Sequence, residues 1–241
     1  MIELYYFPTP NCHKITIFLE EARVDYRLVV TSIVKGEQFA PAFVDKFPNG
    51  KIPAIVDRTP RSGGAPLTVF ESGAILLYLA ERYEVLLPTS AEKRAETLQW
   101  LFWQVGGLGP MCGQNHHFQH YAPPTLDPGT LEYARTRFID ETSRLYAVLD
   151  GRLSDREFVA GEYSIADIAC YPWINAHGKQ SQSLADYPHL KRWCEQIAAR
   201  PAVERAYQAA MKIDANPTVT DESRRFLYGQ NAKTVRLHRR Q

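Results

Sequence analysis

The stretch IELYYFPTPNCHKITIFLEEARVDYRLVV, residues 2–30, predicts a strand, a helix and a second strand in succession. Its first part, residues 2–7, is short and rich in aliphatic and aromatic side chains, as buried strands are. Thr9 is a good N-cap, and Pro10 suits the first helical position because an N–H would have no partner there. Apolar residues then follow at helical spacing. Tyr26–Val30 has the composition of a strand, which a right-handed crossover would make parallel to the first.

Polar turns separate two further strands and a helix downstream. The turn NGKIP at 49–53 leads into a strand at 54–56. A glycine-rich turn at 61–64 then separates that strand from another at Leu67–Phe70, and residues 71–83 have helical periodicity. We therefore predict an α/β domain of order βαβ followed by ββα, with a small mixed sheet.

The remainder of the chain has helical patterns only. The apolar face of residues 98–105 runs into GGLGP at 106–110, which should bend that helix. SIAD at 164–167 is a capping box. We expect an α/β domain at 1–86, an all-helical domain at 90–213, and an extension at 214–241 that is partly ordered or disordered.

Composition excludes several functional classes. The 28 basic and 27 acidic residues leave a net charge of +1, so the chain lacks the basic field of a nucleic-acid binder. Its apolar runs are shorter than the ~20 residues of a membrane span, and its start lacks signal-peptide character. The four cysteines are scattered along the chain, and no two of them form a C-x-x-C motif. His116 and His120 have the spacing of zinc ligands without an evident third ligand. We expect a cytoplasmic protein with no metal and no nucleic-acid or membrane partner.

Several stretches of the sequence resemble one family. They are TPN at 9–11, NGKIP at 49–53, ES at 71–72, LQWLFWQVGGLGPM at 98–111, QNHHF at 114–118 and SIAD at 164–167. Over about residues 1–212, the chain resembles the nu-class bacterial glutathione transferases, the YfcG-like and Ure2p-like group. The resemblance implies a thioredoxin-like N-terminal domain, a helical glutathione-transferase C-terminal domain, a homodimer, and glutathione (reduced or as its disulfide) as co-substrate.

The residue types suit that tripeptide. Ile52, before a Pro53 that the family places in a cis bond, can pair its backbone with the cysteinyl unit. Ionised Glu71 only accepts hydrogen bonds, which suits the ligand's ammonium, and Ser72 at a helix start suits the neighbouring carboxylate. Alone, such a pair is more often an N-cap beside a solvated charge. With the Ile52-Pro53 turn upstream, we favour binding.

The resemblance implies that Thr9 and Asn11 face the glutathione sulfur, in place of the catalytic Tyr, Ser or Cys of other classes. Their hydroxyl and amide hydrogens would favour the thiolate. The resemblance also implies that Gln38 reaches the glycyl end and that Arg137 acts from the partner subunit, with Arg135 as the alternative register. The competing interpretations are simple capping for Thr9 and a solvated helix charge for Arg137.

Cys12 departs from the family, whose members carry glycine at this position. Counted from Thr9, it falls at the second cysteine of a C-x-x-C pair, so one interpretation is a resolving or glutathionylated thiol. The other is an inert, packed cysteine. We favour packing, because a resolving cysteine needs a nucleophilic partner and Thr9 is not one.

The favoured function is glutathione-dependent disulfide-bond reduction by thiol–disulfide exchange, with organic hydroperoxide reduction as a further activity. One alternative is a transferase that conjugates glutathione to small electrophiles, which the shape of an apolar pocket would decide. The other is a non-catalytic glutathione-binding regulator. The apolar cluster at 226–228 in the basic extension either folds over the cleft or belongs to a disordered tail.

Overall fold

The computed structural model describes residues 1–122, 125–213 and 220–238, in two compact units. The first unit, Met1–Arg82 with Ala202–Gln241, holds strands β1 (Ile2–Tyr6), β2 (Tyr26–Val30), β3 (Ala54–Asp57) and β4 (Leu67–Phe70), and helices α1 (Pro10–Glu21), α2 (Pro41–Val44), α3 (Ser72–Tyr83), α9 (Pro201–Met211), α10 (Asp221–Tyr228) and α11 (Ala232–His238). The second, Tyr83–Pro201, holds α4 (Ala91–Trp103), α5 (Gly109–His116), α6 (Pro128–Arg152), α7 (Ile165–Ile174) and α8 (Pro188–Ala198). The predicted βαβ–ββα order and the helical second half are confirmed.

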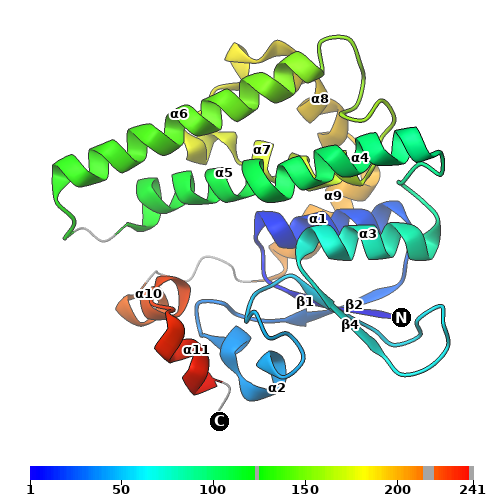
Figure 1. Ribbon diagram of the computed structural model, residues 1–241, viewed down its shortest axis with the longest axis horizontal. Helices are drawn as coiled ribbons and strands as arrows, with labels where there is room; N and C mark the ends of the chain where they lie inside the picture. Colours follow the sequence, from blue (N-terminus) through cyan, green and yellow to red (C-terminus); the bar gives the residue numbers. More distant parts are fainter. Residues whose placement is uncertain (123–124, 214–219, 239–241) are drawn as a thin grey trace. The chain divides into compact units, whose positions relative to one another are not determined.

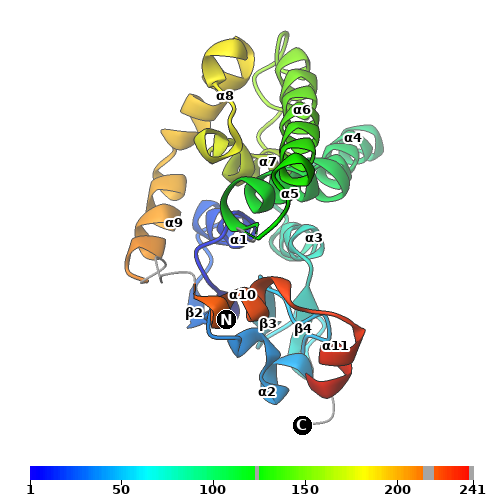
Figure 2. The same ribbon diagram turned by 90° about the vertical axis from the view of Figure 1, so that its left-hand side faces the viewer.

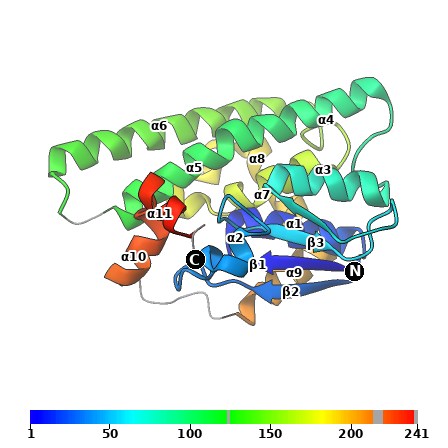
Figure 3. The same cartoon turned by 60° about the horizontal axis from the view of Figure 1, so that its bottom comes forward.

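The four strands form one mixed sheet in the order β2-β1-β3-β4. β1 is parallel to β2 and antiparallel to β3, and β3 is antiparallel to β4. Figure 3 shows β1 between β2 and β3. The βαβ crossover through α1 therefore produces the parallel β1–β2 pair, and the turn after β3 produces the antiparallel β3–β4 pair.

Helices cover both faces of this sheet. α1 and α3 lie on one face and α2 lies on the other (Figure 1). Strand alternation divides β3 between the two layers: Ala54 and Val56 pack in a cluster with Phe43 and Phe47 from the α2 segment. On the opposite face, the buried Asp57 carboxylate accepts a hydrogen bond from the Tyr78 hydroxyl of α3 (2.7 Å). The sheet is thus fixed from both sides.

The second unit is a helical bundle whose glycine-rich stretch adopts the expected irregular geometry. Between α4 and α5 the chain forms a π-helical turn, Gln104–Leu108. Ser164 and Asp167 form the predicted capping box at the start of α7. The buried Asp167 carboxylate also accepts hydrogen bonds from the Val159 N–H and the Trp193 indole N–H, both at 2.9 Å. Burial raises the pKa of Asp167 to about 6, against the lowering effect of these donors. Across the described residues, no helix is long and apolar enough to span a bilayer.

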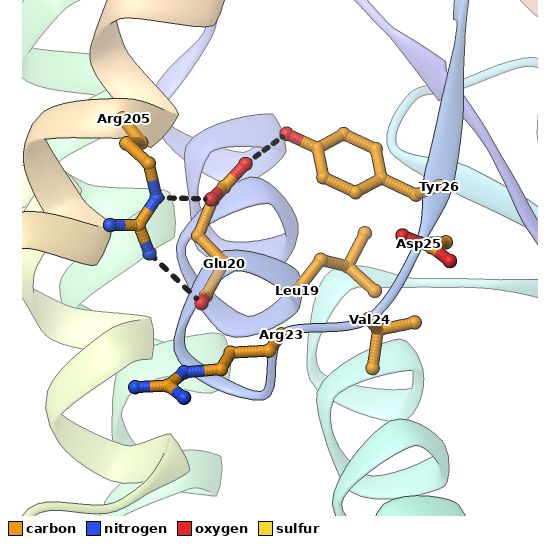
Figure 4. Close-up of a pocket in the computed structure, with 7 residues that line it drawn as sticks. All are labelled: Leu19, Glu20, Arg23, Val24, Asp25, Tyr26 and Arg205. Atoms are coloured by element: carbon orange, nitrogen blue, oxygen red, sulfur yellow. Dashed lines mark hydrogen bonds and ion pairs between the residues drawn. The ribbon is translucent and has the colours of Figure 1, made fainter.

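α9 packs with the first unit, whereas the sequence pattern grouped it with the helical domain. Arg205 donates to the Glu20 carboxylate (2.7 Å), and Tyr207 stacks on the His13 ring at 4.2 Å between centroids. The surface hollow beside this junction is drawn in Figure 4, where Tyr26 also donates to Glu20 (2.9 Å). Glu20 binds both Tyr26 and Arg205 there, and none of the predicted ligand-binding residues lines the hollow. The hollow is a structural junction that attaches α9 to α1 and β2.

Part of the C-terminal extension also packs on the first unit. Residues 214–219 and 239–241 lie outside the described residues, and the rest forms α10 and α11, drawn beside the α2 segment (Figures 1 and 2). The Phe226 ring of α10 covers Gly36, so closely that a Cβ at Gly36 would lie 2.6 Å from a ring carbon. Gly36 has φ +75°, a left-handed conformation that side chains disfavour. Phe226, the first residue of the apolar cluster at 226–228, therefore packs α10 beside the loop that carries Gln38.

We predict that Gly36→Ala detaches α10, because the added methyl group occupies the space of the Phe226 ring. Hydrogen exchange at residues 221–228 should become at least tenfold faster. Gly63→Ala is the matched control, since Gly63 also has positive φ (+62°) but nothing within 4 Å of its Cβ position. It should cost about 1–2 kcal/mol of backbone strain and leave exchange in α10 unchanged. Equal exchange in both variants would contradict the contact.

Candidate functional site

One edge of the sheet gathers the loops that hold the predicted site residues. Ala54 pairs with Tyr5 of β1 on one side and with Phe70 of β4 on the other. Since β3 runs opposite to both neighbours, its start lies at the same edge as the ends of β1 and β4. The segment after β1, the turn before β3 and the start of α3 therefore converge.

Thr9 is the N-cap of α1, as predicted. Its backbone is extended (φ −137°, ψ 154°), and its Oγ1 accepts the Cys12 N–H at 3.3 Å. A threonine hydroxyl has one hydrogen to donate besides the lone pairs that accept. The cap therefore leaves that hydrogen for a second partner at the positive end of the helix dipole. Asn11 follows in the first turn and is partly exposed.

The turn before β3 presents Ile52 at the same edge. The Ile52–Pro53 peptide bond is cis, as the family resemblance implied. Pro53 is buried, whereas Ile52 is only partly buried and packs against the Phe43–Phe47 cluster. The backbone of Ile52 thus lies where the loops converge, and an extended peptide can pair with such a segment.

Glu71 joins β4 to α3 in an uncommon conformation. Its φ is +71°, in the left-handed region that residues other than glycine rarely adopt and that is enriched at functional sites. The side chain is exposed, and the Asn49 amide donates to its Oε1 at 3.0 Å. Asn49 therefore orients a carboxylate whose other oxygen can accept from a cation. Sequence reasoning treated Asn49 only as a turn residue and missed this role.

Ser72 is the first residue of α3, and a buried lysine lies behind it. The Lys14 ammonium donates to Ser72 Oγ at 3.1 Å, and the Lys14 residue is only 1% exposed. The first i→i−4 bond of α3 joins Ile75 N–H to Glu71 C=O, so the N–H groups of its first turn precede the intrahelical ladder. Hydrogen-bond donors at Ser72 therefore lie next to the acceptor at Glu71.

Comparisons with known proteins identify the family. Profiles of the glutathione S-transferase N-terminal and C-terminal domains match residues 1–81 and 131–201. The chain is 58% identical over 215 residues to the disulfide-bond oxidoreductase YfcG of Escherichia coli, covering 89% of this chain and 98% of that protein. The chain belongs to the glutathione S-transferase family. The resemblance drawn from residues 1–212 is thereby confirmed.

Two solved glutathione transferases have similar folds. One from Burkholderia graminis, with two glutathione molecules bound per subunit, has a TM-score of 0.80 and 39% identity, covering 86% of this chain and 88% of that chain. One from Pseudomonas putida, with one glutathione disulfide bound per subunit, has a TM-score of 0.78 and 39% identity, covering 85% and 90%. The fold of this glutathione S-transferase is thus shared by proteins that hold two glutathione molecules or one glutathione disulfide per subunit.

Gln38 lies inside its loop. The residue is 4% exposed, and its Nε2 donates to the Ile33 carbonyl at 3.4 Å. Its Oε1 is buried without a hydrogen-bond partner. Contact with the glycyl end of glutathione stays a prediction, and it requires the amide to turn outward or the ligand to reach into the loop.

The two candidate arginines differ in how they are held within the second unit. Arg135 donates its Nε to the Phe118 carbonyl at 3.0 Å and is partly buried. Arg137 is on the same helix with 54% of its side chain exposed, 3.7 Å from a Glu141 carboxylate that Arg144 already binds through two hydrogen bonds. Arg137 is therefore the more available of the two, although its role stays a prediction.

All four cysteines of this glutathione S-transferase are buried and reduced. Cys12 is fully buried beneath the first turn of α1, and burial raises the pKa of its thiol to about 11. Burial also raises the pKa of Cys194 to about 12 and that of Cys112 further. The burial of Cys12 agrees with the packing interpretation. Within the described ranges, no group of three or more His, Cys, Asp and Glu side chains is arranged to hold a metal ion.

We predict that native Cys12 resists alkylation. Burial raises the pKa of the Cys12 thiol from 9.0 to about 11, which leaves roughly a hundredfold less thiolate at neutral pH, and the thiolate is the reactive form. Iodoacetamide at pH 8 should label Cys12 at under a tenth of the rate seen in guanidinium, as read by peptide mass spectrometry. Labelling at equal rates in both conditions would restore the resolving-thiol interpretation.

Proposed function

We propose that this protein is a glutathione-dependent disulfide-bond reductase. The observation that carries the proposal is the combination of a hydrogen-bond donor at Thr9 with the burial of every cysteine. Such a site can stabilise a thiolate, but the protein has no exposed cysteine to supply one. The reactive sulfur therefore comes from the ligand. The similar YfcG is named as a disulfide-bond oxidoreductase, which supports the same reaction class here.

Glutathione would bind with its parts matched to the edge of the sheet. Glu71 would accept the ammonium of the γ-glutamyl unit, and Ser72 with the first turn of α3 would donate to its carboxylate. The backbone of Ile52, before Pro53, would pair with the cysteinyl unit. Its sulfur would then lie at the start of α1, near Thr9 and Asn11, while Gln38 would serve the glycyl end.

The reaction would proceed by two thiol–disulfide exchanges. The thiolate of one glutathione attacks a sulfur of the substrate disulfide, forming a mixed disulfide and releasing one substrate thiolate. The thiolate of a second glutathione attacks the glutathione sulfur of that mixed disulfide, forming glutathione disulfide and releasing the other substrate thiolate. Two glutathione thiols are oxidised and one disulfide is reduced, and the two glutathione protons end on the substrate thiols.

The protein would supply alignment and charge stabilisation. Thr9 and Asn11 would donate to the attacking sulfur, and each unit by which they lower the thiol pKa corresponds to about 1.4 kcal/mol. Alignment of the reacting sulfurs removes most of the entropic cost of bringing them together. We also propose a homodimer in which Arg137 of each subunit serves the partner's site, since a guanidinium binds a carboxylate through two hydrogen bonds. The same thiolate chemistry extends to organic hydroperoxides.

Substrate comparison tests the proposed function. With glutathione at saturation, turnover of 2-hydroxyethyl disulfide should exceed conjugation of 1-chloro-2,4-dinitrobenzene by at least tenfold, because the site favours sulfur attack on sulfur. Both rates are followed spectrophotometrically with one preparation. Faster conjugation would favour the transferase alternative, and glutathione binding without turnover of either substrate would favour a regulator.

We predict that Thr9→Ala lowers the rate of disulfide reduction by about 10- to 100-fold, the equivalent of one hydrogen bond to a charged group, ~1.5–3 kcal/mol. Thr9→Ser retains both the helix cap and the donated hydrogen and should keep most of the activity. Thermal unfolding of each variant separates loss of the cap, about 1 kcal/mol, from loss of catalysis. Equal activity of folded Thr9→Ala and wild type would remove Thr9 from the mechanism.

A further inference from the structure

A buried ammonium lies directly behind the expected γ-glutamyl site. Lys14 of α1 is 1% exposed and is among the largest fully buried side chains of the protein. Lysines are almost never fully buried unless a partner compensates the charge. Lys14 lies in α1, whose buried residues also include Ile15, Ile17 and Phe18. The burial of Lys14 therefore follows from the packing of α1 against the sheet.

Lys14 is the donor in its contact with Ser72. The Lys14 Nζ donates to Ser72 Oγ across 3.1 Å, and in its ammonium form Lys14 has three donors and no acceptor, so Ser72 Oγ is then the acceptor. The hydroxyl hydrogen of Ser72 is then directed away from Lys14. Positive charge on Lys14 polarises the hydroxyl, which makes Ser72 a stronger donor to an anion on its other side.

The surroundings match a zwitterion. The Ser72 hydroxyl and the first-turn N–H groups of α3 donate, while the exposed Glu71 carboxylate, oriented by Asn49, accepts. A carboxylate and an ammonium on one carbon atom, as at the α-carbon of a γ-glutamyl unit, present the complementary pattern. Glu71 holds its side chain there at the cost of a positive φ.

We propose that Lys14 is a positioning residue for the ligand's α-carboxylate, acting through the Ser72 hydroxyl. The inference rests on the proposed glutathione site and adds to it a third, buried residue that the ligand does not touch. Lys14 then contributes to recognition of the carboxylate specifically, and leaves recognition of the α-ammonium to Glu71. A lysine that only fastened α1 to α3 would affect both ligand groups alike.

Two glutathione analogues separate these possibilities. In 4-aminobutyryl-Cys-Gly the α-carboxylate is missing and the amine is kept, whereas glutaryl-Cys-Gly lacks the amine and keeps the carboxylate. Calorimetry gives the affinity of wild type, Lys14→Met and Lys212→Met for glutathione and both analogues. The affinity for glutathione divided by that for each analogue is the preference ratio for the missing carboxylate or amine. Lys212 lies after α9 and is exposed, so it serves as the matched control.

Wild type and Lys212→Met should prefer glutathione over the carboxylate-free analogue by at least tenfold. Lys14→Met should reduce that ratio to within about threefold of unity and leave the ratio for the amine-free analogue unchanged. Unchanged ratios, or an equal weakening of all three ligands, would overturn the inference. Should Lys14→Met fail to fold, Lys14→Gln removes the charge and keeps a hydrogen-bond donor toward Ser72, and it should lower the same ratio and leave the ratio for the amine-free analogue unchanged.

The outcomes also distinguish this inference from the proposed function. If wild type binds neither glutathione nor the analogues at millimolar concentration, the proposed site itself is wrong. If wild type binds glutathione with the carboxylate preference and Lys14→Met retains that preference, only the role of Lys14 is wrong.

Discussion

Strand β3 is hydrogen-bonded on both sides, to β1 and to β4, and the candidate site depends on this double pairing. Ala54 lies opposite Tyr5 and Phe70, so a shift of either register by one residue would displace the start of α1 or of α3 relative to the Ile52–Pro53 turn. The pairing is fixed by packing on both faces, through the Phe43–Phe47 cluster on one and through the contact of Asp57 with α3 on the other. Convergence of the site loops therefore follows from the core.

Burial makes the protein's own cysteine thiols poor nucleophiles. A cysteine in the first turn of a helix would ordinarily gain reactivity from the helix dipole. Cys12 occupies that position, but full burial outweighs the neighbouring donors and raises its thiol pKa. Thr9, one helical turn earlier in the chain, is the partly exposed group with a hydrogen to donate. The start of α1 thus has the donor that the proposed function requires for a sulfur that arrives with a ligand.

Local signals predicted much of this arrangement. The Thr9-Pro10 start, the strand at Tyr26–Val30 and the Ser164 capping box depend on nearby residues, and the structure agrees with each. Lys14 was missed because its hydrogen bond to Ser72 joins residues 58 positions apart, although a lysine among buried apolar helix residues was the available signal. The inward orientation of Gln38 and the contact of Phe226 with Gly36 likewise depend on distant parts of the chain. The packing of α9 with the first unit rests on Arg205 and Glu20, whose pairing no local pattern encodes.

The central claim is that glutathione, and not a cysteine of the chain, carries the reactive sulfur. The most direct test is the intact mass of the protein, quenched with acid during steady turnover of a small disulfide with glutathione. A single species at the mass of the unmodified polypeptide is expected while glutathione disulfide accumulates. A turnover-dependent species heavier by one glutathione, mapped to Cys12 or another cysteine, would contradict it.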